Sequence, residues 1–291
     1  MSDDPRTEYP QPPLKDDSQP APGITAKMRE KPDHGERSYV GKGLLKGKVA
    51  LVTGGDSGIG RAVAIAYARE GADIAISYLK VEQIDAEETR RWVEKAGRRC
   101  LLLPGDIGDP AHCRSLVEST IAEFGHLDVL VNNAAHQTVN EGLGDIAVID
   151  VETSFKVNVF AMIWLAQAAV PHMKPGASIV NTTSVQAKVA TETMLVYAAT
   201  KGAIASLTIG LSNLLAPKRI RVNCVAPGPI WTPIQVIAKD EDEMAELGAK
   251  TPLGRSGQPS ELAPAFVLLA SDEGSYMTGA LLPVTGGMPM L

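Results

Sequence analysis

Residues 48–66 restrict the fold of this chain more than any other stretch. They begin with a β-branched run, residues 49–53, whose length and composition predict a buried parallel strand. Four glycines interrupt that run, and apolar residues then recur with helical spacing from Arg61. Strand, glycine turn and helix together can hold a pyrophosphate, because glycine lets the backbone approach the anion and the helix N-terminus attracts it. The spacing, TGxxxGxG, differs from GxGxxG and from the P-loop, so a purely structural turn stays open as the alternative.

Strand-like and helical patterns alternate along the rest of the chain. Short apolar runs lie at residues 73–79, 100–103, 127–131, 178–182 and 220–225, and helical patterns separate them at 81–96, 110–124, 151–173 and 197–215. Alternation of this kind predicts βαβ units, and therefore an α/β fold with one doubly wound parallel sheet that has helices on both faces. At 291 residues the chain suits one large domain of this class.

Charge and cysteine usage exclude several classes of function. The net charge of −6 gives no basic surface for a nucleic acid. The three cysteines, Cys100, Cys113 and Cys224, are scattered and odd in number, which argues against a disulfide framework and against a zinc site, so no metal is expected. We find no secretory signal pattern and no apolar run of transmembrane length, and we expect a cytoplasmic protein without a membrane partner.

Residues 1–45 differ in composition from the remainder, residues 46–291. Prolines are spread among charged and small residues, with few large apolar side chains, so this segment cannot form a core of its own. It is either a disordered tail or an extended arm that docks on its own domain or on a neighbouring subunit. Pro12-Pro13, Met28 and Tyr39 would be the anchors of such an arm.

Polar and glycine residues follow the carboxyl ends of successive predicted strands. They are residues 54–60, Asp106, residues 132–135, residues 183–184 and residues 227–228. Ligands of open parallel sheets bind at this edge, so these residues are expected to converge on one cleft. The convergence predicts a dinucleotide site, which a single glycine motif could not do.

Tyr197 and Lys201 lie four residues apart on a predicted helix and therefore on one face of it. A nearby ammonium group stabilises a phenolate and lowers the tyrosine pKa toward the range where it exchanges protons. Ser184 follows a buried strand and can reach the same cleft, where its hydroxyl could bind a carbonyl or alcohol oxygen. Asn158 lies inside an apolar helix, either as a core hydrogen-bonding group or as a polar bridge to Lys201. A Tyr–Lys pair is also common on ordinary helix surfaces.

These motifs together resemble the short-chain dehydrogenase/reductase family. The resemblance covers about residues 46–291 and is carried by TGGDSGIG, Asp106, the NNA stretch at 132–134, YAATK at 197–201 and PGPIWT at 227–232, with Asn158 and Ser184 at matching positions. The long Pro-rich start followed by SYVGKGLLKGKVALVTGGDSGIGR further resembles a glucose/ribitol dehydrogenase-like, or aldehyde-reductase-like, subgroup. The family implies a single Rossmann-type sheet of about seven strands in the order 3-2-1-4-5-6-7.

The resemblance also implies roles for individual residues. Tyr197 would be the general acid/base, and Lys201 would lower its pKa and bind the nicotinamide ribose. Ser184 would orient the substrate oxygen, and Asn158 would hold a water in the proton relay. The residues implied to contact the cofactor, besides Tyr197 and Lys201, are Gly54, Ser57, Gly58, Ile59, Gly60, Tyr78, Leu79, Asp106, Ile107, Asn133, Ala134, Pro227, Gly228, Ile230 and Thr232.

The end of the second strand departs from the usual pattern. An NAD enzyme typically has an acid there for the ribose 2′-hydroxyl, and an NADP enzyme often has an arginine. This chain has Ser77, Tyr78 and Leu79, followed by Lys80. Lys80 and Arg61 are candidate partners of a 2′-phosphate, and the cofactor is expected to be NADP or NAD without a resolved preference.

Residues 230–259 form a long connection of the kind that often serves as a lid. By resemblance this segment binds the substrate, and the alternative is a pair of surface helices. The expected substrate pocket comprises His136, Gln137, Gln186, Met194 and Trp231. His136 fits a pocket wall better than a catalytic base.

The expected function is hydride transfer between NAD(P)(H) and a small carbonyl or alcohol substrate, namely an aldehyde, sugar or polyol. A 3-oxoacyl-carrier-protein reductase uses the same residues and is the alternative enzyme. A non-catalytic dinucleotide-sensing protein is the alternative outside enzymes. The apolar helices at 151–173 and 198–215 need a partner surface, and a homotetramer is expected by resemblance.

Overall fold

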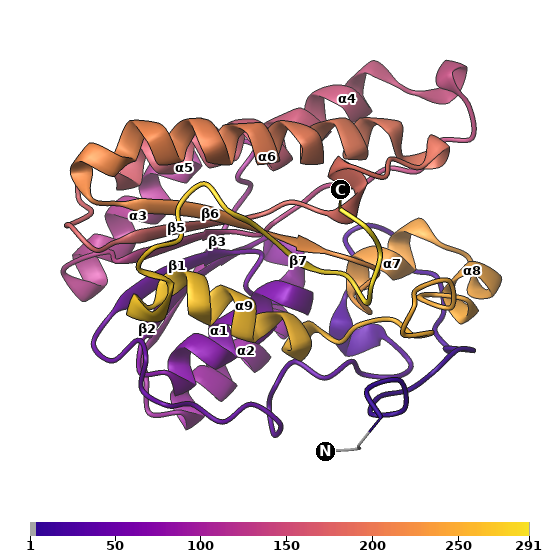
Figure 1. The fold of residues 1–291 in the computed structure, drawn as a ribbon, viewed down its shortest axis with the longest axis horizontal. Helices are drawn as coiled ribbons and strands as arrows, with labels where there is room; N and C mark the ends of the chain where they lie inside the picture. Colours follow the sequence, from indigo (N-terminus) through magenta and orange to yellow (C-terminus); the bar gives the residue numbers. More distant parts are fainter. Residues whose placement is uncertain (1–3, 291) are drawn as a thin grey trace.

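The fold is built on one sheet of seven parallel strands in the order β3-β2-β1-β4-β5-β6-β7 (Figure 1). It was obtained as a computed structural model, and the structure describes residues 4–290. The strands are β1 Val49–Thr53, β2 Asp73–Tyr78, β3 Cys100–Pro104, β4 Val129–Asn132, β5 Ser178–Thr182, β6 Arg221–Pro227 and β7 Leu281–Val284. The predicted α/β class, the single doubly wound sheet and the strand order are confirmed.

Helices cover both faces of the sheet, as predicted. One apolar core packs α1, α2 and α9 against one face, and a second packs α3, α5 and α6 against the other (Figure 1). The helices are α1 Gly58–Arg69, α2 Gln83–Lys95, α3 Pro110–Phe124, α4 Val148–Phe155, α5 Ala161–Ala169, α6 Leu195–Leu215, α7 Pro233–Ala238, α8 Glu241–Ala245 and α9 Pro259–Ala270. Because β1 is buried on both faces, its whole sequence is apolar or β-branched, without alternation.

The segment predicted as one helix over 151–173 has a different local geometry. α4 and α5 are joined by a π-helical turn, Lys156–Phe160, so the backbone is helical from Val148 to Ala169, is widened in the middle and ends before the predicted limit at residue 173. Asn158 lies in this turn and is completely buried. A π turn admits one extra residue into the helix, which periodicity in the sequence does not reveal, and such turns are frequent at functional sites.

The α6 region corrects the expectation that no apolar stretch reaches transmembrane length. The helical run Glu192–Lys218 is long and apolar enough to cross a membrane by length and composition alone, and among residues 4–290 it is the one helix that meets both criteria. In this fold α6 packs on β6 and β5. Only 33% of the apolar window is buried, so packing on the sheet accounts for part of its apolar composition.

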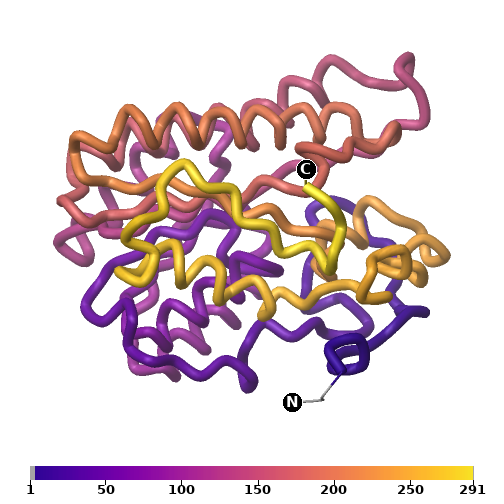
Figure 2. Tube along the Cα trace, in the orientation of Figure 1, coloured from indigo at the N-terminus to yellow at the C-terminus, as the bar shows by residue number. Residues whose placement is uncertain are grey.

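The N-terminal segment lies against α7 and α8, the two short helices of the segment 230–259 (Figure 2). The Leu14 amide donates to the Ala245 carbonyl over 3.1 Å, and the Gln19 amide donates to the Val236 carbonyl over 2.9 Å. Leu14 and Met28 are buried in an apolar cluster whose other members are Trp231, Val236, Met244 and Leu247. The N-terminal segment is thus tied to α7 and α8 by both backbone and side-chain contacts.

The predicted anchors of this segment differ in their burial. Met28 is buried, and the Tyr39 hydroxyl donates to the Glu70 carboxylate over 2.6 Å. Pro12 is only half-buried and Pro13 is exposed, so the anchor at this point is Leu14 instead. Proline has no N–H group, whereas Leu14 supplies both an amide and a branched apolar side chain. The division into an arm, residues 1–45, and a domain, residues 46–291, stays a prediction, and residues 1–3 and 291 lie outside the described part of the chain.

Met28→Ala is expected to loosen the contact between the N-terminal segment and the two short helices. Met28 is 3% exposed, and truncating a buried methionine to alanine costs about 2–5 kcal/mol. We expect faster amide hydrogen exchange across α7 and α8, with exchange in β1 unchanged. Val40→Ala is the control, because Val40 is 78% exposed in the same segment. Unchanged protection of α7 and α8 in Met28→Ala would show that the segment does not stabilise them.

Candidate active site

A cleft of about 790 Å³ opens at the carboxyl edge of the sheet. Its wall combines the loops that follow β1 to β6 with α6, α7 and the segment Ala21 to Gly23. These loops meet there because all seven strands are parallel and end at the same edge.

Most of the residues predicted for the site line this cleft. From the catalytic set they are Ser184, Tyr197 and Lys201. From the cofactor set they are Gly54, Ser57, Gly58, Ile59, Tyr78, Leu79, Asp106, Ile107, Asn133, Ala134, Pro227, Gly228, Ile230 and Thr232, and from the substrate set His136, Gln137, Gln186 and Met194. Asn158, Gly60 and Trp231 are not part of the wall, and the roles assigned to all these residues stay predictions.

Trp231 is a correction to the predicted substrate pocket. Its side chain is 1% exposed and belongs to the apolar cluster with Leu14 and Met28. The indole Nε1 donates to the Asp16 carboxylate over 3.2 Å. The ring therefore faces the N-terminal segment, where both its apolar surface and its N–H group find partners.

The glycine turn after β1 is held against the loop after β4. Gly54 and Gly58 have positive φ angles of 62° and 48°, which glycine adopts without strain. The Asn133 side-chain amide donates to the carbonyls of Thr53 and Gly54 over 3.1 and 3.2 Å. A methyl group on Gly60 would lie 1.8 Å from the Gly54 carbonyl oxygen, so Gly60 is the contact that lets α1 approach the turn.

The N-terminus of α1 faces the cleft with its amide groups uncapped by side chains. Ser57 is the N-cap residue and makes no side-chain cap hydrogen bond. The first amide groups of a helix lack intrahelical partners and carry the positive end of the helix dipole. Together with the glycine turn, this is a suitable site for a pyrophosphate.

Ser184, Tyr197 and Lys201 form a cluster in the same wall. The Lys201 ammonium lies 5.1 Å from the centroid of the Tyr197 ring and donates to the Thr182 carbonyl over 3.0 Å. Burial lowers the pKa of Lys201 to about 7. The Ser184 hydroxyl accepts from the Gln186 amide over 3.2 Å, which fixes it at the end of β5.

The Tyr197 pKa is shifted upward in this structure. Burial raises the pKa of Tyr197 to about 12, and the hydrogen bond with Ser184 lowers it in part. The phenol is protonated at neutral pH, as an unshifted tyrosine is, and the raised pKa makes it a weaker acid than free tyrosine. The pKa-lowering effect of Lys201, implied by the family resemblance, stays a prediction.

Asn158 joins the loop after β4 to α6. Its Oδ1 accepts from the His136 amide over 2.7 Å, and its Nδ2 donates to the His136 carbonyl over 2.9 Å and to the Thr200 hydroxyl over 3.0 Å. These bonds hold His136 in the wall beside the α6 residues. The proposed water bridge from Asn158 to Lys201 stays a prediction.

The two cations predicted to hold a 2′-phosphate do not line the cleft. Arg61 is buried and forms an ion pair with Asp85 over 3.1 Å, and Lys80 is exposed in the 3₁₀ turn Lys80–Glu82. Two acids that the sequence analysis missed, Asp56 and Glu82, line the cleft instead. Asp56 is the aspartate of TGGDSGIG, so its place in the glycine turn could have been predicted from the sequence.

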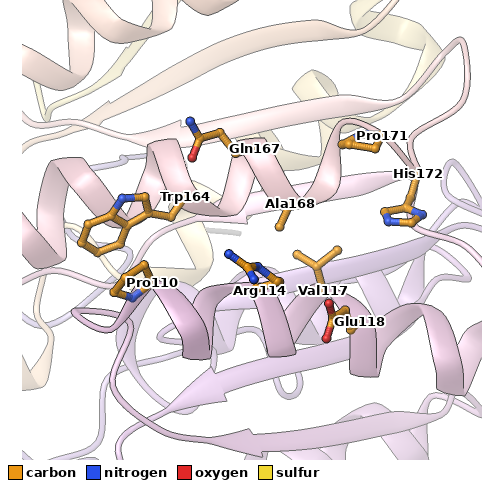
Figure 3. Close-up of a pocket in the computed structure, with 9 residues that line it drawn as sticks. All are labelled: Pro110, Arg114, Val117, Glu118, Trp164, Gln167, Ala168, Pro171 and His172. Carbon is orange, nitrogen blue, oxygen red and sulfur yellow. The ribbon is translucent and has the colours of Figure 1, made fainter.

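A second, smaller hollow of about 330 Å³ lies between α3 and α5 (Figure 3). Its wall combines Arg114 and Glu118 of α3 with Trp164, Gln167 and Ala168 of α5. The serine, tyrosine and lysine cluster is not part of it.

A seven-stranded parallel sheet with this order, a glycine turn after β1 and a Ser–Tyr–Lys cluster at its carboxyl edge define an oxidoreductase of the Rossmann type. The particular class follows from a family comparison, in which the family described as enoyl-(acyl carrier protein) reductase matches residues 54–289. The chain belongs to the short-chain dehydrogenase/reductase family.

Relatives and solved structures agree with this assignment. The chain is 52% identical to the uncharacterized oxidoreductase YhdF of Bacillus subtilis, over 91% of this chain and 92% of that protein. It is 44% identical to glucose and ribitol dehydrogenase homolog 2 of Arabidopsis thaliana, over 95% of this chain and 97% of that protein. The solved structure of a blue fluorescent protein from a metagenomic library, in complex with NADPH, is similar with a TM-score of 0.78 and 36% identity, covering 84% of this chain and 98% of that chain.

Proposed function

We propose that the protein transfers a hydride between NAD(P)(H) and a small carbonyl or alcohol substrate. The observation that carries this proposal is the arrangement of Ser184, Tyr197 and Lys201 in the same cleft as the glycine turn and the α1 N-terminus. The nicotinamide supplies the hydride chemistry when it is bound. The solved relative described above contains NADPH, which supports a cofactor of this class.

The residues present fit such a cofactor. The uncapped amide groups of α1 suit the pyrophosphate. A methyl group on Gly54 would lie 3.0 Å from Ala134 Cα, so glycine is what allows the turn to pack this closely on the loop after β4. Asp106 and Ile107 lie in the cleft wall after β3, where the adenine is expected. Lys201 is the residue we assign to the nicotinamide ribose.

The chain's own residues then handle the substrate oxygen and the proton. Ser184 holds the carbonyl oxygen by donating a hydrogen bond, and Tyr197 donates its phenolic proton to that oxygen as the carbonyl carbon gains the hydride. Lys201 is close enough to Tyr197 to stabilise the phenolate that this leaves. The carbonyl becomes an alcohol, and in the reverse direction Tyr197 accepts the proton.

An aldehyde, sugar or polyol is the substrate class we favour. The pocket side chains His136, Gln137 and Gln186 are polar, with Met194 as an apolar contact, which suits a small hydroxylated substrate. The name of the Arabidopsis relative points the same way. A 3-oxoacyl-carrier-protein reductase would need a basic rim for its acidic carrier, but the two lid lysines in the cleft wall, Lys239 and Lys250, are balanced there by the lid glutamates Glu243 and Glu246.

The proposal is tested by following nicotinamide absorbance with NADH and NADPH against aldehydes, ketones, aldoses and one 3-oxoacyl thioester. We expect turnover with at least one small carbonyl compound. Turnover of the thioester alone would favour the carrier-protein reductase. Cofactor binding without turnover of any compound would favour the dinucleotide-sensing role, and absence of cofactor binding would contradict the proposal.

The oligomeric state and the cellular location stay proposals. A homotetramer is supported by apolar side chains that are exposed on α4, on the π-helical turn after it and on α6: Val151, Phe160, Ile209 and Leu214. Exposed apolar patches often mark protein–protein contacts. The cytoplasmic location rests on the sequence features alone.

A further inference from the structure

The N-terminal segment contributes a short loop to the wall of the large cleft. Ala21, Pro22 and Gly23 line the cleft together with the glycine turn, the N-terminus of α1 and the first residues of α7. This loop lies outside residues 54–289, the part of the chain that matches the family. The cleft therefore has a wall that the family's own motifs do not supply.

Gln19 closes this loop on itself. Its side-chain oxygen accepts from the Ile24 amide over 2.9 Å, and its side-chain nitrogen donates to the Ile24 carbonyl over 3.3 Å. One glutamine side chain thus bridges the two ends of residues 20–23 and holds the turn between them. The Ile24 side chain is itself buried, which adds an apolar anchor at the end of the loop.

The loop is attached to α7 at its first end. The Gln19 amide donates to the Val236 carbonyl over 2.9 Å. Gly23 is buried, and a methyl group on it would lie 2.6 Å from the Pro233 carbonyl oxygen and 3.0 Å from the Ile237 Cγ2. Because the first of these atoms is backbone, a side chain at residue 23 would push the loop away from α7. Glycine therefore allows the loop to lie directly on the helix that borders the cleft.

The chain that follows the loop is attached to α2. The amides of Thr25 and Ala26 donate to the two carboxylate oxygens of Asp85 over 2.6 and 3.0 Å. Asp85 is 1% exposed and forms an ion pair with Arg61 of α1 over 3.1 Å. A buried ion pair is costly to break, so Asp85 is a firm attachment point. Residues 19–26 thus bridge α7 and α2, and the middle of this bridge lines the cleft.

We propose that residues 19–26 form a strap that closes one side of the dinucleotide site, so that the bound cofactor leaves only after the strap has detached from α7. This inference rests on the proposed function, and it adds Ala21, Pro22 and Gly23 to the residues that contact the cofactor. Their side chains carry no charge, so the strap contributes apolar contact and exclusion of water. Gln19 is a positioning residue, because it acts by holding the loop.

The attachments of the strap determine how long the cofactor stays bound. If release requires the detached form, the dissociation rate constant rises in proportion to the population of that form. Weaker attachment to α7 increases this population. The glycine turn and the α1 N-terminus, where the pyrophosphate is expected, are unchanged by it. The strap therefore affects the residence time of the cofactor and does not alter the chemical step.

The test is a stopped-flow measurement of the release of NADH and NADPH, followed by the fluorescence of the reduced nicotinamide, without any substrate. In Gln19→Ala and in Gly23→Ala we expect the dissociation rate constant to rise about tenfold, which corresponds to about 1.4 kcal/mol and to the loss of one or two hydrogen bonds. The association rate constant should stay within about threefold, since interface changes act mainly on dissociation.

Gln11→Ala is the matched control for Gln19→Ala. Gln11 is exposed in the same segment, its side chain donates to the Arg6 carbonyl over 2.7 Å, and neither residue lines the cleft. Cofactor release from this variant should match that from the wild type. A rise equal to that in Gln19→Ala would contradict the specific role of the loop at the cleft.

Amide hydrogen exchange at Thr25 and Ala26 shows whether the strap has detached in each variant. Faster exchange together with an unchanged release rate would contradict the role of the strap in retaining the cofactor. Unchanged exchange in both variants would contradict the roles assigned to Gln19 and Gly23. Binding of neither cofactor by the wild type would contradict the proposed function as well, and this result is distinguishable from the other two.

Discussion

Tyr197→Phe is expected to lower kcat by a factor of about 10²–10⁴, the range that a positioned general acid contributes. Phenylalanine keeps the ring that lies 5.1 Å from the Lys201 ammonium, so packing in the cleft is preserved. The change removes only the hydroxyl that hydrogen-bonds with Ser184 and supplies the proton. The dissociation constant of the cofactor is therefore expected to stay within a few-fold of the wild-type value, while turnover of the best carbonyl substrate is lost.

Tyr67→Phe is the matched control for this change. The Tyr67 hydroxyl is buried and donates to the Phe266 carbonyl over 3.0 Å, in the core that packs α1 on α9. Deleting it should cost about 1 kcal/mol of folding free energy and leave kcat unchanged. If Tyr197→Phe retained wild-type turnover, the proton would have to come from another group in the cleft, and His136 would be the next residue to replace.

Gly60→Ala is expected to weaken cofactor binding strongly and to destabilise the fold. The added methyl group would lie 1.8 Å from the Gly54 carbonyl oxygen and 2.7 Å from the Asn133 side-chain nitrogen. The first of these is backbone, so relief requires α1 to move away from the glycine turn. Overpacking of a well-packed site costs about 1–3 kcal/mol or more, and the same movement disrupts the proposed pyrophosphate site. We expect affinity for the dinucleotide to fall more than 100-fold, since each tenfold corresponds to only about 1.4 kcal/mol.

Gly144→Ala separates this effect from a general effect of glycine replacement. Gly144 is exposed, and a methyl group on it would meet nothing within 4 Å. Its stability and cofactor affinity should match the wild type to within about 0.5 kcal/mol. Thermal unfolding and calorimetric titration of both variants provide the measurement. Cofactor affinity of wild-type strength in Gly60→Ala would show that α1 and the glycine turn do not need this close contact.

Several elements of the fold were predictable because their signals are local. The predicted strands at 49–53 and 178–182 and the predicted helix at 110–124 agree with β1, β5 and α3. A buried parallel strand is indicated by a short β-branched run, and a helix by apolar residues that recur every 3.6 residues. Both signals lie within a short stretch of sequence. β7 was not located in advance, because it is a half-buried strand of four residues that includes Pro283.

The site was predictable only to the extent that the carboxyl ends of parallel strands lie at the same edge of the sheet, where ligands bind. The parallel order brings Ser184 and the glycine turn to one cleft, and the four-residue spacing puts Tyr197 and Lys201 on the same side of α6. The rule says nothing about which way a particular side chain turns. Arg61 and Asp56 show this limit, because the basic side chain pairs within the protein and the acidic one lines the cleft.

The alternation of strands and helices followed from local sequence patterns, and with it the parallel sheet, the edge that carries the site and the residues gathered there. The partners of individual side chains became known only once the chain was folded. Trp231 bonds to Asp16, 215 residues away, and Asp85 accepts from the amide of Thr25, 60 residues away. Such pairs depend on how distant segments dock, and docking is selected by the shape, charge and hydrogen-bonding needs of both surfaces at once. Periodicity and local spacing describe one segment at a time and therefore do not contain this information.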